Sequence, residues 1–338
     1  MNRQEPQPAA TAARVRSASI SRLLVAALFA LVAAGQAVAQ APARVVYLAP
    51  GNAASTAARL IAFREGMRDN GLIEGRHYLF DVSYAEGDAA RSPAMVREVL
   101  QRKPAVIMVS STSMARAAQQ ATSTVPIVMM AINDPVESGL VASLARPGGN
   151  ITGQSTQALD AMAKYVELLR ETLPRARRIA LLVNPDNAST SRLVGQVRAA
   201  SASIEVRLFE AATPAALDAT FAAIAQHRPD ALLVLRDSMF ISEYQRVSGF
   251  ALNSRIPAFV PSSEFVDAGG LLSFAPSLND MFRRSANFVK KILAGAKPAD
   301  LPVEQPTRFE LVINMKTAKT LGLTIPHTVL LRAERLVE

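Results

Sequence analysis

The stretch Pro104-Ala105-Val106-Ile107-Met108-Val109-Ser110-Ser111-Thr112-Ser113 joins a short apolar run to four consecutive hydroxyl-bearing residues. The run Val106–Val109 is apolar on both faces, which is typical of an internal strand in a parallel sheet covered by helices. Helical periodicity begins at Met114, so the hydroxyl residues lie where a strand ends and a helix starts. Ligands of open α/β sheets bind at such strand ends, which makes this turn a candidate binding element.

The same alternation of strands and helices extends along the chain. In the first half we predict strands near Arg44–Leu48, Tyr78–Ser83, Ala105–Val109 and Ile127–Ile132, and helices near Thr56–Asn70, Ala89–Arg102 and Met114–Thr122. In the second half we predict strands near Ile179–Val183, Glu205–Phe209, Ala231–Leu235 and Ala258–Val260, and helices near Ser189–Ser201, Pro214–Gln226 and Ser242–Asn253. The pattern predicts an α/β fold with βαβ units and parallel sheets.

The first forty residues have the features of a cleavable export signal. Arg14, Arg16 and Arg22 precede an apolar run at 23–34, and Ala37-Val38-Ala39 has the small residues that signal peptidase accepts. We therefore expect residues 1–39 to be removed, the mature protein to begin at Gln40, and its location to be the periplasm. A disordered tail or a short signal anchor is the alternative interpretation.

Composition limits the class of protein. The mature chain would have 338 − 39 = 299 residues, which suggests two domains of ordinary size. There is no cysteine, which excludes thiol catalysis, cysteine metal sites and a lipoprotein anchor. The formal charge of +9 includes +3 from the signal, and the basic residues are scattered, so we expect no nucleic acid partner.

Polar residues follow the predicted strands in both halves, and they are our candidate ligand-binding residues. They are Ser111, Thr112, Asn133, Asp134, Asp186, Asp237, Ser238 and Glu264. The hydroxyl turn could hold a carboxylate, while Asp237 or Glu264 could accept hydrogen bonds from an ammonium group or pair with Arg236. The alternative for each residue is helix capping, because serine, threonine, asparagine and aspartate are the favoured N-caps.

Two aromatic residues near strand ends, Tyr47 and Phe274, could stack on a ring of the ligand. The alternative is that both are core residues.

Catalytic and metal-binding patterns are missing. His77, His227 and His327 are far apart and lack zinc spacing, and neither a phosphate-binding P-loop motif nor a G-x-S-x-G elbow occurs. Asp134 and Glu137 are near each other, but turn formation explains both. We therefore expect no enzyme activity, no cofactor and no metal.

Several longer motifs resemble a known family, the ABC transporter substrate-binding proteins related to tryptophan- and tyrosine-binding members. The motifs are Asn133-Asp134-Pro135-Val136, the stretches 139–153, 184–187 and 264–270, and the tail 309–319. The resemblance covers essentially the whole mature chain. It implies a type I periplasmic binding protein fold, in which two Rossmann-like lobes are joined by crossing strands and close on a ligand.

The resemblance also implies lobe boundaries. The first lobe would contain 40–152 plus about 277–300, and the second 153–276 plus about 306–338. The stretch Ala296–Thr307 is rich in proline and polar residues, which predicts a connector between the last long helix and the final strand. Crossings are expected at Gly149–Ser155 and Leu271–Ser277. The chain departs from many relatives at Asn133, where glycine is common, and at Phe274, where tyrosine is common.

The function implied by the resemblance is capture of a small amphipathic solute, such as an aromatic amino acid, by a monomeric protein. The closed form would be presented to an ABC permease in the inner membrane. A sensory protein that docks on a receptor kinase and a secreted α/β enzyme are the alternatives.

Overall fold

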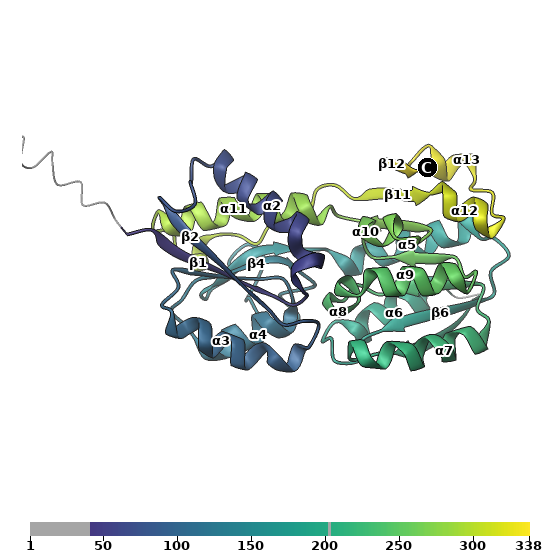
Figure 1. The fold of residues 1–338 in the computed structure, drawn as a ribbon, viewed down its shortest axis with the longest axis horizontal. Coiled ribbons are helices and arrows are strands. Elements are labelled where there is room, and N and C mark those ends of the chain that lie inside the picture. Colours follow the sequence, from purple (N-terminus) through teal and green to yellow (C-terminus); the bar gives the residue numbers. More distant parts are fainter. Residues whose placement is uncertain (1–40, 202–203) are drawn as a thin grey trace, which may run out of the picture. The chain divides into compact units, whose positions relative to one another are not determined.

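The computed structural model describes residues 41–201 and 204–338, except for the side chains of residues 158–160. The predicted signal peptide lies outside the described residues. Residues Pro42–Glu338 form one compact unit that contains two separate β-sheets (Figure 1). We call each sheet, with the helices packed on it, a lobe.

The first lobe is built on a five-stranded parallel sheet with the order β2-β1-β3-β4-β5. Its strands are β1 (Ala43–Ala49), β2 (Tyr78–Tyr84), β3 (Val106–Val109), β4 (Ile127–Ile132) and β5 (Ile151–Ser155). The helices are α2 (Ala53–Asp69), α3 (Ser92–Gln101) after the short η1 (Ala89–Arg91), α4 (Thr112–Ala121) and α11 (Leu278–Leu293). The four strands predicted in this half are confirmed.

Two apolar cores hold the first sheet between its helices. One core contains Met95 and Val99 of α3 and Met114 of α4. The opposite core contains Phe63 of α2 and Phe282 of α11, so a helix from far along the chain completes this face (Figure 1). The two helices pack closely: a Cβ atom at Gly66 would lie 2.1 Å from the main-chain oxygen of Arg283, so only glycine fits there.

The second lobe is built on a seven-stranded sheet with the order β12-β11-β10-β9-β8-β6-β7. Its strands are β6 (Arg178–Val183), β7 (Glu205–Glu210), β8 (Ala231–Val234), β9 (Ala258–Val260), β10 (Leu272–Ala275), β11 (Glu310–Asn314) and β12 (Arg335–Val337). The helices are α5 (Ala158–Thr172), α6 (Thr190–Ala200), α7 (Leu217–His227) after η2 (Pro214–Ala216), α8 (Ser238–Ser242), α9 (Tyr244–Asn253), α10 (Ser263–Asp267), α12 (Met315–Leu321) and α13 (His327–Leu330).

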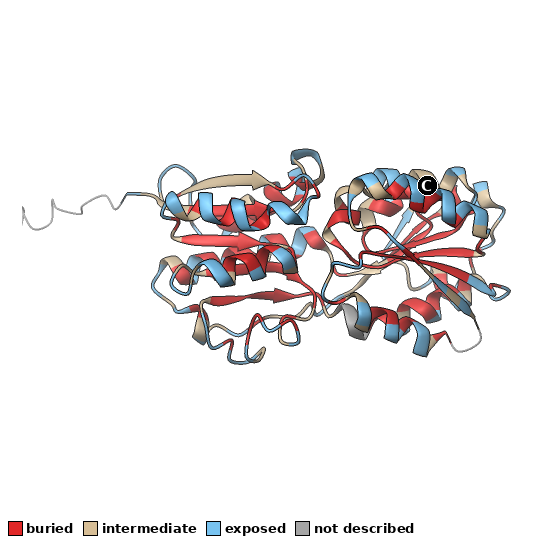
Figure 2. Ribbon diagram, turned by 90° about the horizontal axis from the view of Figure 1, so that it is seen from below, coloured by how far each residue is buried: buried red, intermediate tan, exposed pale blue. Residues whose placement is uncertain are grey.

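Burial follows this layered arrangement in both lobes. Figure 2 shows the central strands buried, while the helices are buried on their inner faces and exposed outside. Strands such as Val106–Val109 and Ala231–Val234 are buried at every position, as their continuous apolar sequence predicts.

The second sheet departs from the expectation of a purely parallel sheet, because β11 runs antiparallel to β10. The reason lies in the connections. The chain leaves β10 for the first lobe, where it forms α11 and the short η3 (Pro298–Asp300), and then returns. Since β11 enters the sheet from the edge at which β10 leaves it, the two strands must point in opposite directions.

Three segments connect the lobes, after β5, after β10 and before β11. The first and third lie side by side: the amide of Ser155 donates to the carbonyl of Glu304, and the amide of Glu304 donates to the carbonyl of Gly153. Thr152 Oγ1 adds a bond to the carbonyl of Leu301. Within the described residues no helix is both long and apolar enough to cross a membrane.

A candidate ligand cavity between the two lobes

The carboxyl ends of strands from both sheets line a cavity of about 360 Å³. The volume lies in the range of about 300–1,000 Å³ that small-molecule sites usually have. First-lobe residues at its wall include Ser110, Ser111, Thr112, Ser113, Arg116 and Asn133. Second-lobe residues include Asn184, Asp186, Asn187, Arg236, Asp237 and Ser238. Six of the ten predicted site residues therefore lie on one cavity: Ser111, Thr112, Asn133, Asp186, Asp237 and Ser238.

The hydroxyl turn forms part of the first-lobe wall. Ser111 is the N-cap of α4, because its Oγ accepts a bond from the amide of Met114 at 3.2 Å. Its Oγ also lies 3.2 Å from Ser113 Oγ, while Ser110 Oγ lies 2.7 Å from the Tyr47 hydroxyl. Capping and cavity lining are thus combined in Ser111, as both interpretations of its sequence predict. Thr112, half-buried, lines the same wall.

Asn133 follows β4 and connects three parts of the molecule. Its amide nitrogen donates to the main-chain carbonyl of Arg236 in the second lobe at 3.3 Å, and its amide oxygen accepts from Thr156 Oγ1 at 2.7 Å. Because both polar atoms are in use, Asn133 holds the lobes together at the cavity wall.

Asp134 and Glu137 both bind Arg192 of the second lobe. Each carboxylate lies 2.8 Å from an Arg192 nitrogen. Asp134 has a left-handed backbone conformation, with a φ of 49°, which turns the chain directly after the strand. The two acids predicted to be close are therefore joined by a cation that bridges the lobes.

Asp237 organises the second-lobe wall. The residue is 6 % exposed, and its carboxylate accepts bonds from the amide of Met239 at 2.8 Å, Asn184 Nδ2 at 3.1 Å and Asn187 Nδ2 at 2.7 Å. Three donors therefore satisfy the carboxylate oxygens at a place that water barely reaches. Two of them are cavity-lining asparagines, so Asp237 orients this wall as well as contributing to it.

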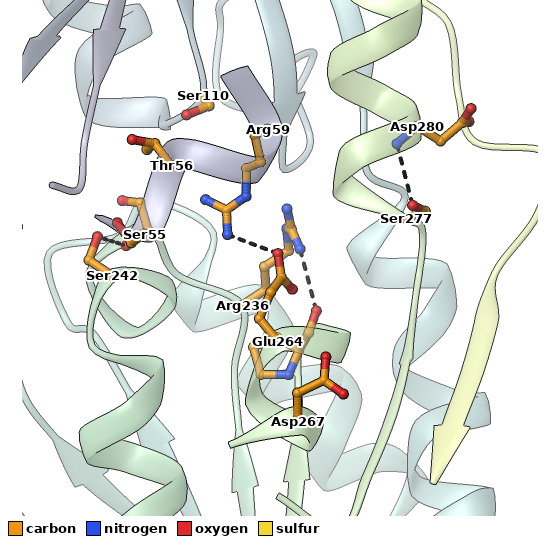
Figure 3. A network of polar contacts seen from close by, with 12 residues as sticks. Ser55, Thr56, Arg59, Ser110, Arg236, Ser242, Glu264, Asp267, Ser277 and Asp280 are labelled. Atoms are coloured by element: carbon orange, nitrogen blue, oxygen red, sulfur yellow. Dashed lines mark hydrogen bonds and ion pairs between the residues drawn. The ribbon is translucent and has the colours of Figure 1, made fainter. Parts of the chain in front are cut away.

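Glu264 does not line the cavity, and it pairs with Arg59 of α2 at 3.1 Å across the lobes. Burial has the largest single effect on Glu264 and raises its pKa, but the positive charge of Arg59 and the hydrogen bonds to the carboxylate together outweigh burial, so the pKa is lowered from its usual value. Figure 3 shows Glu264 reaching toward Arg59, with the Arg236 guanidinium nearby. The alternative pairing of Glu264 with Arg236 is not found among the described contacts.

Arg236 lies at the centre of the region between the lobes. It is 9 % exposed, and it lines the main cavity and two small neighbouring cavities of about 20 and 30 Å³. Burial, followed by the charge of Arg59, lowers the pKa of Arg236 to about 10, so the side chain remains charged at neutral pH. From the sequence we expect Arg236 only as an ion-pair partner, although its place between β8 and Asp237 puts it at a strand end.

The two aromatic candidates are not at the main cavity. Tyr47 is fully buried, and its ring packs edge-on against Phe282 with 5.7 Å between centroids. Phe274 stacks on Phe309 at 5.2 Å and lines the cavity of about 30 Å³ behind Arg236. Both rings are occupied by core or linker contacts, which was the alternative interpretation, and a role in ligand stacking stays a prediction for each.

The histidines show no shared site. His77 accepts from the amide of Ile73, His227 contacts Arg207, and His327 begins α13. Within the described residues, no group of three or more histidine, aspartate or glutamate side chains is arranged to hold a metal ion.

Residues 52–337 match the family model described as ABC transporter substrate binding protein. A tyrosine-binding protein of Clostridioides difficile is 27% identical over 263 residues, which cover 77% of this chain and 75% of the relative.

Two solved structures are similar over most of the chain. A conserved domain protein from Vibrio cholerae is 29% identical with a TM-score of 0.81, covering 87% of this chain and 99% of that one. An ABC domain from Streptococcus pneumoniae in complex with L-Trp is 26% identical with a TM-score of 0.78, covering 87% of this chain and 100% of that one.

Proposed function

Because the chain belongs to the ABC transporter substrate-binding protein family, we propose that it captures a small amphipathic solute between its lobes for an ABC importer. The observation that carries the proposal is the cavity of about 360 Å³ at which the strand ends of both sheets meet. Solute capture needs a site that both lobes complete, and this one draws polar groups from each of them.

The transport step would be hinge closure. Three segments connect the lobes, and the contacts Asn133–Arg236, Arg59–Glu264 and Arg192–Asp134 reach across the space between them. A ligand that touches both lobes favours the closed form by the difference between its affinities for the two forms. The closed, monomeric protein would then dock on a membrane permease outside the cytoplasm, where the predicted export signal would deliver it.

An amino acid is the leading candidate for the solute. A relative is named a tyrosine-binding protein, and a similar structure holds L-Trp. The cavity has groups that suit an amino acid, since hydroxyls and amides can bind a carboxylate and the acids Asp186 and Asp237 can bind an ammonium group. No reaction is part of this proposal, because the wall residues are explained by hydrogen bonding and capping.

Thermal unfolding of the mature protein, Gln40–Glu338, against a panel of solutes would test the proposal. The panel contains amino acids, simple carboxylates and neutral sugars. A ligand at about 100 times its Kd should stabilise the protein by roughly 2.7 kcal/mol. Small-angle scattering of the same samples should show compaction with the ligand that shifts the midpoint. If no compound in the panel changes either the unfolding midpoint or the compactness of the protein in scattering, solute capture is contradicted.

A further inference from the structure

Arg236 is a buried cation that lines the cavity, and it forms no salt bridge with any acid in the described residues, although Glu264 and Asp237 lie near enough to attract its charge. Its guanidinium makes one hydrogen bond within the described part of the chain, to the carbonyl of Pro261 at 3.4 Å, the long end of the usual range. An arginine has five N–H donors, so most of its capacity is unused by this contact.

The nearby acids are already engaged. Glu264 lies 3.1 Å from Arg59, and the two oxygens of Asp237 accept from Met239, Asn184 and Asn187. No salt bridge joins either acid to Arg236 in the residues that the structure describes. Arg59 and Arg236 line one small cavity together, so their charges reinforce each other.

A buried charge without a counter-ion is expensive for a protein. The effective penalty of removing an ion from water is several kcal/mol, and only good pairing repays it. Arg236 is 9 % exposed as a residue, remains charged at neutral pH and lines the main cavity. An anion that enters this cavity would supply the missing partner.

We propose that Arg236 is the counter-ion of a carboxylate on the solute, so that the protein selects solutes bearing this group. The inference rests on the proposed function and deepens it. The planar fork of a guanidinium matches the two oxygens of a carboxylate, and this geometry makes charge-assisted pairs strong. Arg59, fixed by Glu264, adds positive potential beside the site. A neutral solute would leave Arg236 buried and unpaired, which disfavours such solutes.

The orientation of an amino acid would follow from this assignment. Its carboxylate would lie at Arg236, and its ammonium group would lie toward Asp186, an exposed acid on the second-lobe wall. The hydroxyl turn at Ser111 and Thr112 would then contact the remainder of the solute and not its principal charge. This differs from the sequence-based expectation, which gave the carboxylate to the hydroxyl turn.

Matched pairs of acids and amides provide the test. The probes are L-tryptophan with L-tryptophanamide, L-tyrosine with L-tyrosinamide, and indole-3-acetate with indole-3-acetamide. Binding is measured by calorimetry on the wild type and on Arg236→Gln. Hydrogen bonds to charged groups are worth about 1.5–3 kcal/mol, so the wild type should prefer an acid over its amide by roughly 10- to 100-fold. Arg236→Gln should bring this ratio close to one.

Two further variants separate recognition from structure. Arg246→Gln removes an exposed arginine of the same lobe, which pairs with Asp218 and Glu243, and should retain the wild-type ratio. Arg236→Lys should keep part of the preference for acids over amides, because lysine keeps the positive charge but lacks the planar guanidinium that pairs with both carboxylate oxygens. Without ligand, Arg236→Gln should unfold at the wild-type midpoint or above it, since an unpaired buried charge is gone.

The outcomes distinguish the two proposals. Acids that bind with an unchanged acid-to-amide ratio in Arg236→Gln would overturn the role of Arg236 and leave solute capture intact. If only neutral solutes such as sugars bind to the wild type, the role of Arg236 is likewise overturned and solute capture stands. If nothing in the panel binds to the wild type, solute capture itself fails and this inference fails with it. A folded Arg236→Gln whose ratio collapses supports the proposal.

Discussion

The side-chain amide of Asn133 donates to the main-chain carbonyl of Arg236 at 3.3 Å. This one bond joins the end of β4 in the first lobe to the end of β8 in the second. The amide oxygen of the same residue accepts from Thr156 on the first connecting segment. A single side chain therefore couples the cavity wall of each lobe to the segment about which the lobes would move.

Asn133→Ala should weaken closure of the lobes. The change leaves the Thr156 hydroxyl and the Arg236 carbonyl without a partner, at a cost of about 1–3 kcal/mol if both stay buried. We expect weaker ligand binding by calorimetry and a larger radius of gyration in small-angle scattering. Thr156→Val removes only one of the two bonds and should have the smaller effect. Equal compaction in wild type and Asn133→Ala would contradict this role.

Arg192→Met should loosen the outer contact between the lobes. Arg192 binds Asp134 and Glu137, but the three side chains are partly exposed, so the pairs should contribute about 0.2–1 kcal/mol each. Ligand affinity should fall by a few-fold, and the loss should shrink at high salt because screening weakens exposed pairs. Arg198→Met, on the same helix and exposed, is the matched control. A loss of affinity that salt does not change would argue against an electrostatic contact.

The Arg59–Glu264 pair should make stability depend on acidic pH. The pKa of Glu264 is lowered in the folded protein, since the charge of Arg59 and the hydrogen bonds to the carboxylate together outweigh the opposing effect of burial. The unfolded state therefore binds the proton more readily, and stability from this pair is present above about pH 4.3 and lost as the pH falls toward the lowered pKa. Glu264→Gln should lower stability at pH 7 by about 1–3 kcal/mol, because Arg59 is left unpaired.

The difference between wild type and Glu264→Gln in chemical denaturation, measured from pH 3 to 7, checks this behaviour. It should be largest at neutral pH and shrink in acid. A difference that stays constant over the range would mean that the charge of Glu264 contributes nothing.

Alkaline solution should destabilise the protein through its buried tyrosines. Burial raises the pKa of Tyr47 to about 12, although the hydrogen bond with Ser110 acts to lower it. Burial also raises the pKa of Tyr165. Between pH 10 and 12 the unfolded state loses protons that the folded state keeps, so stability falls by up to about 1.4 kcal/mol per pH unit for each group. Tyr47→Phe should reduce this slope.

Ser110→Ala is the control for the alkaline experiment. It removes the hydrogen bond of Tyr47 and keeps the phenol that titrates, so the steep slope should remain. If Tyr47→Phe shows the wild-type slope between pH 10 and 12, the phenol of Tyr47 does not contribute to alkaline unfolding.

Gly66→Ala should disrupt the contact between α2 and α11. The added Cβ would lie 2.1 Å from the carbonyl oxygen of Arg283, and backbone atoms on both helices would have to move. Overpacking of this kind costs about 1–3 kcal/mol, which thermal denaturation detects. Gly195→Ala on α6, where nothing lies within 4 Å, should instead stabilise the protein by about 0.5–1 kcal/mol. Similar midpoints for the two variants would rule out a tight helix contact at Gly66.

Local sequence patterns were sufficient to predict the layers and the strand ends. Continuous apolar runs such as Val106–Val109 identify internal strands, and polar residues directly after them identify the cavity edge. The pairing of Arg59 with Glu264 could not be predicted, because the two residues are 205 positions apart and on different lobes. The same holds for α11, whose apolar face does not reveal which sheet it covers.

Burial of the aromatic candidates also depends on distant contacts. The ring of Tyr47 is near a strand end, as its position predicts, but Phe282 from α11 and the strands around it enclose the ring. Arg236 directly precedes the predicted site residue Asp237, yet the sequence does not reveal that, among the described residues, Glu264 and Asp237 bind other groups and form no salt bridge with Arg236. Contacts between residues far apart in the sequence therefore determine both the burial of Tyr47 and the pairing of Arg236.

The packing of α11 on α2 also sets the order in which the chain can finish folding. Residues Leu60, Phe63 and Met67 of α2 share a core with Phe282, Ala286 and Val289 of α11. A growing chain that has reached only Ser277 contains all strands of the first sheet and most of the second sheet, but it lacks this cover. The lobe made first is therefore completed late, after the second lobe has largely been synthesised, and a protein shortened at this point would present an apolar sheet face to water.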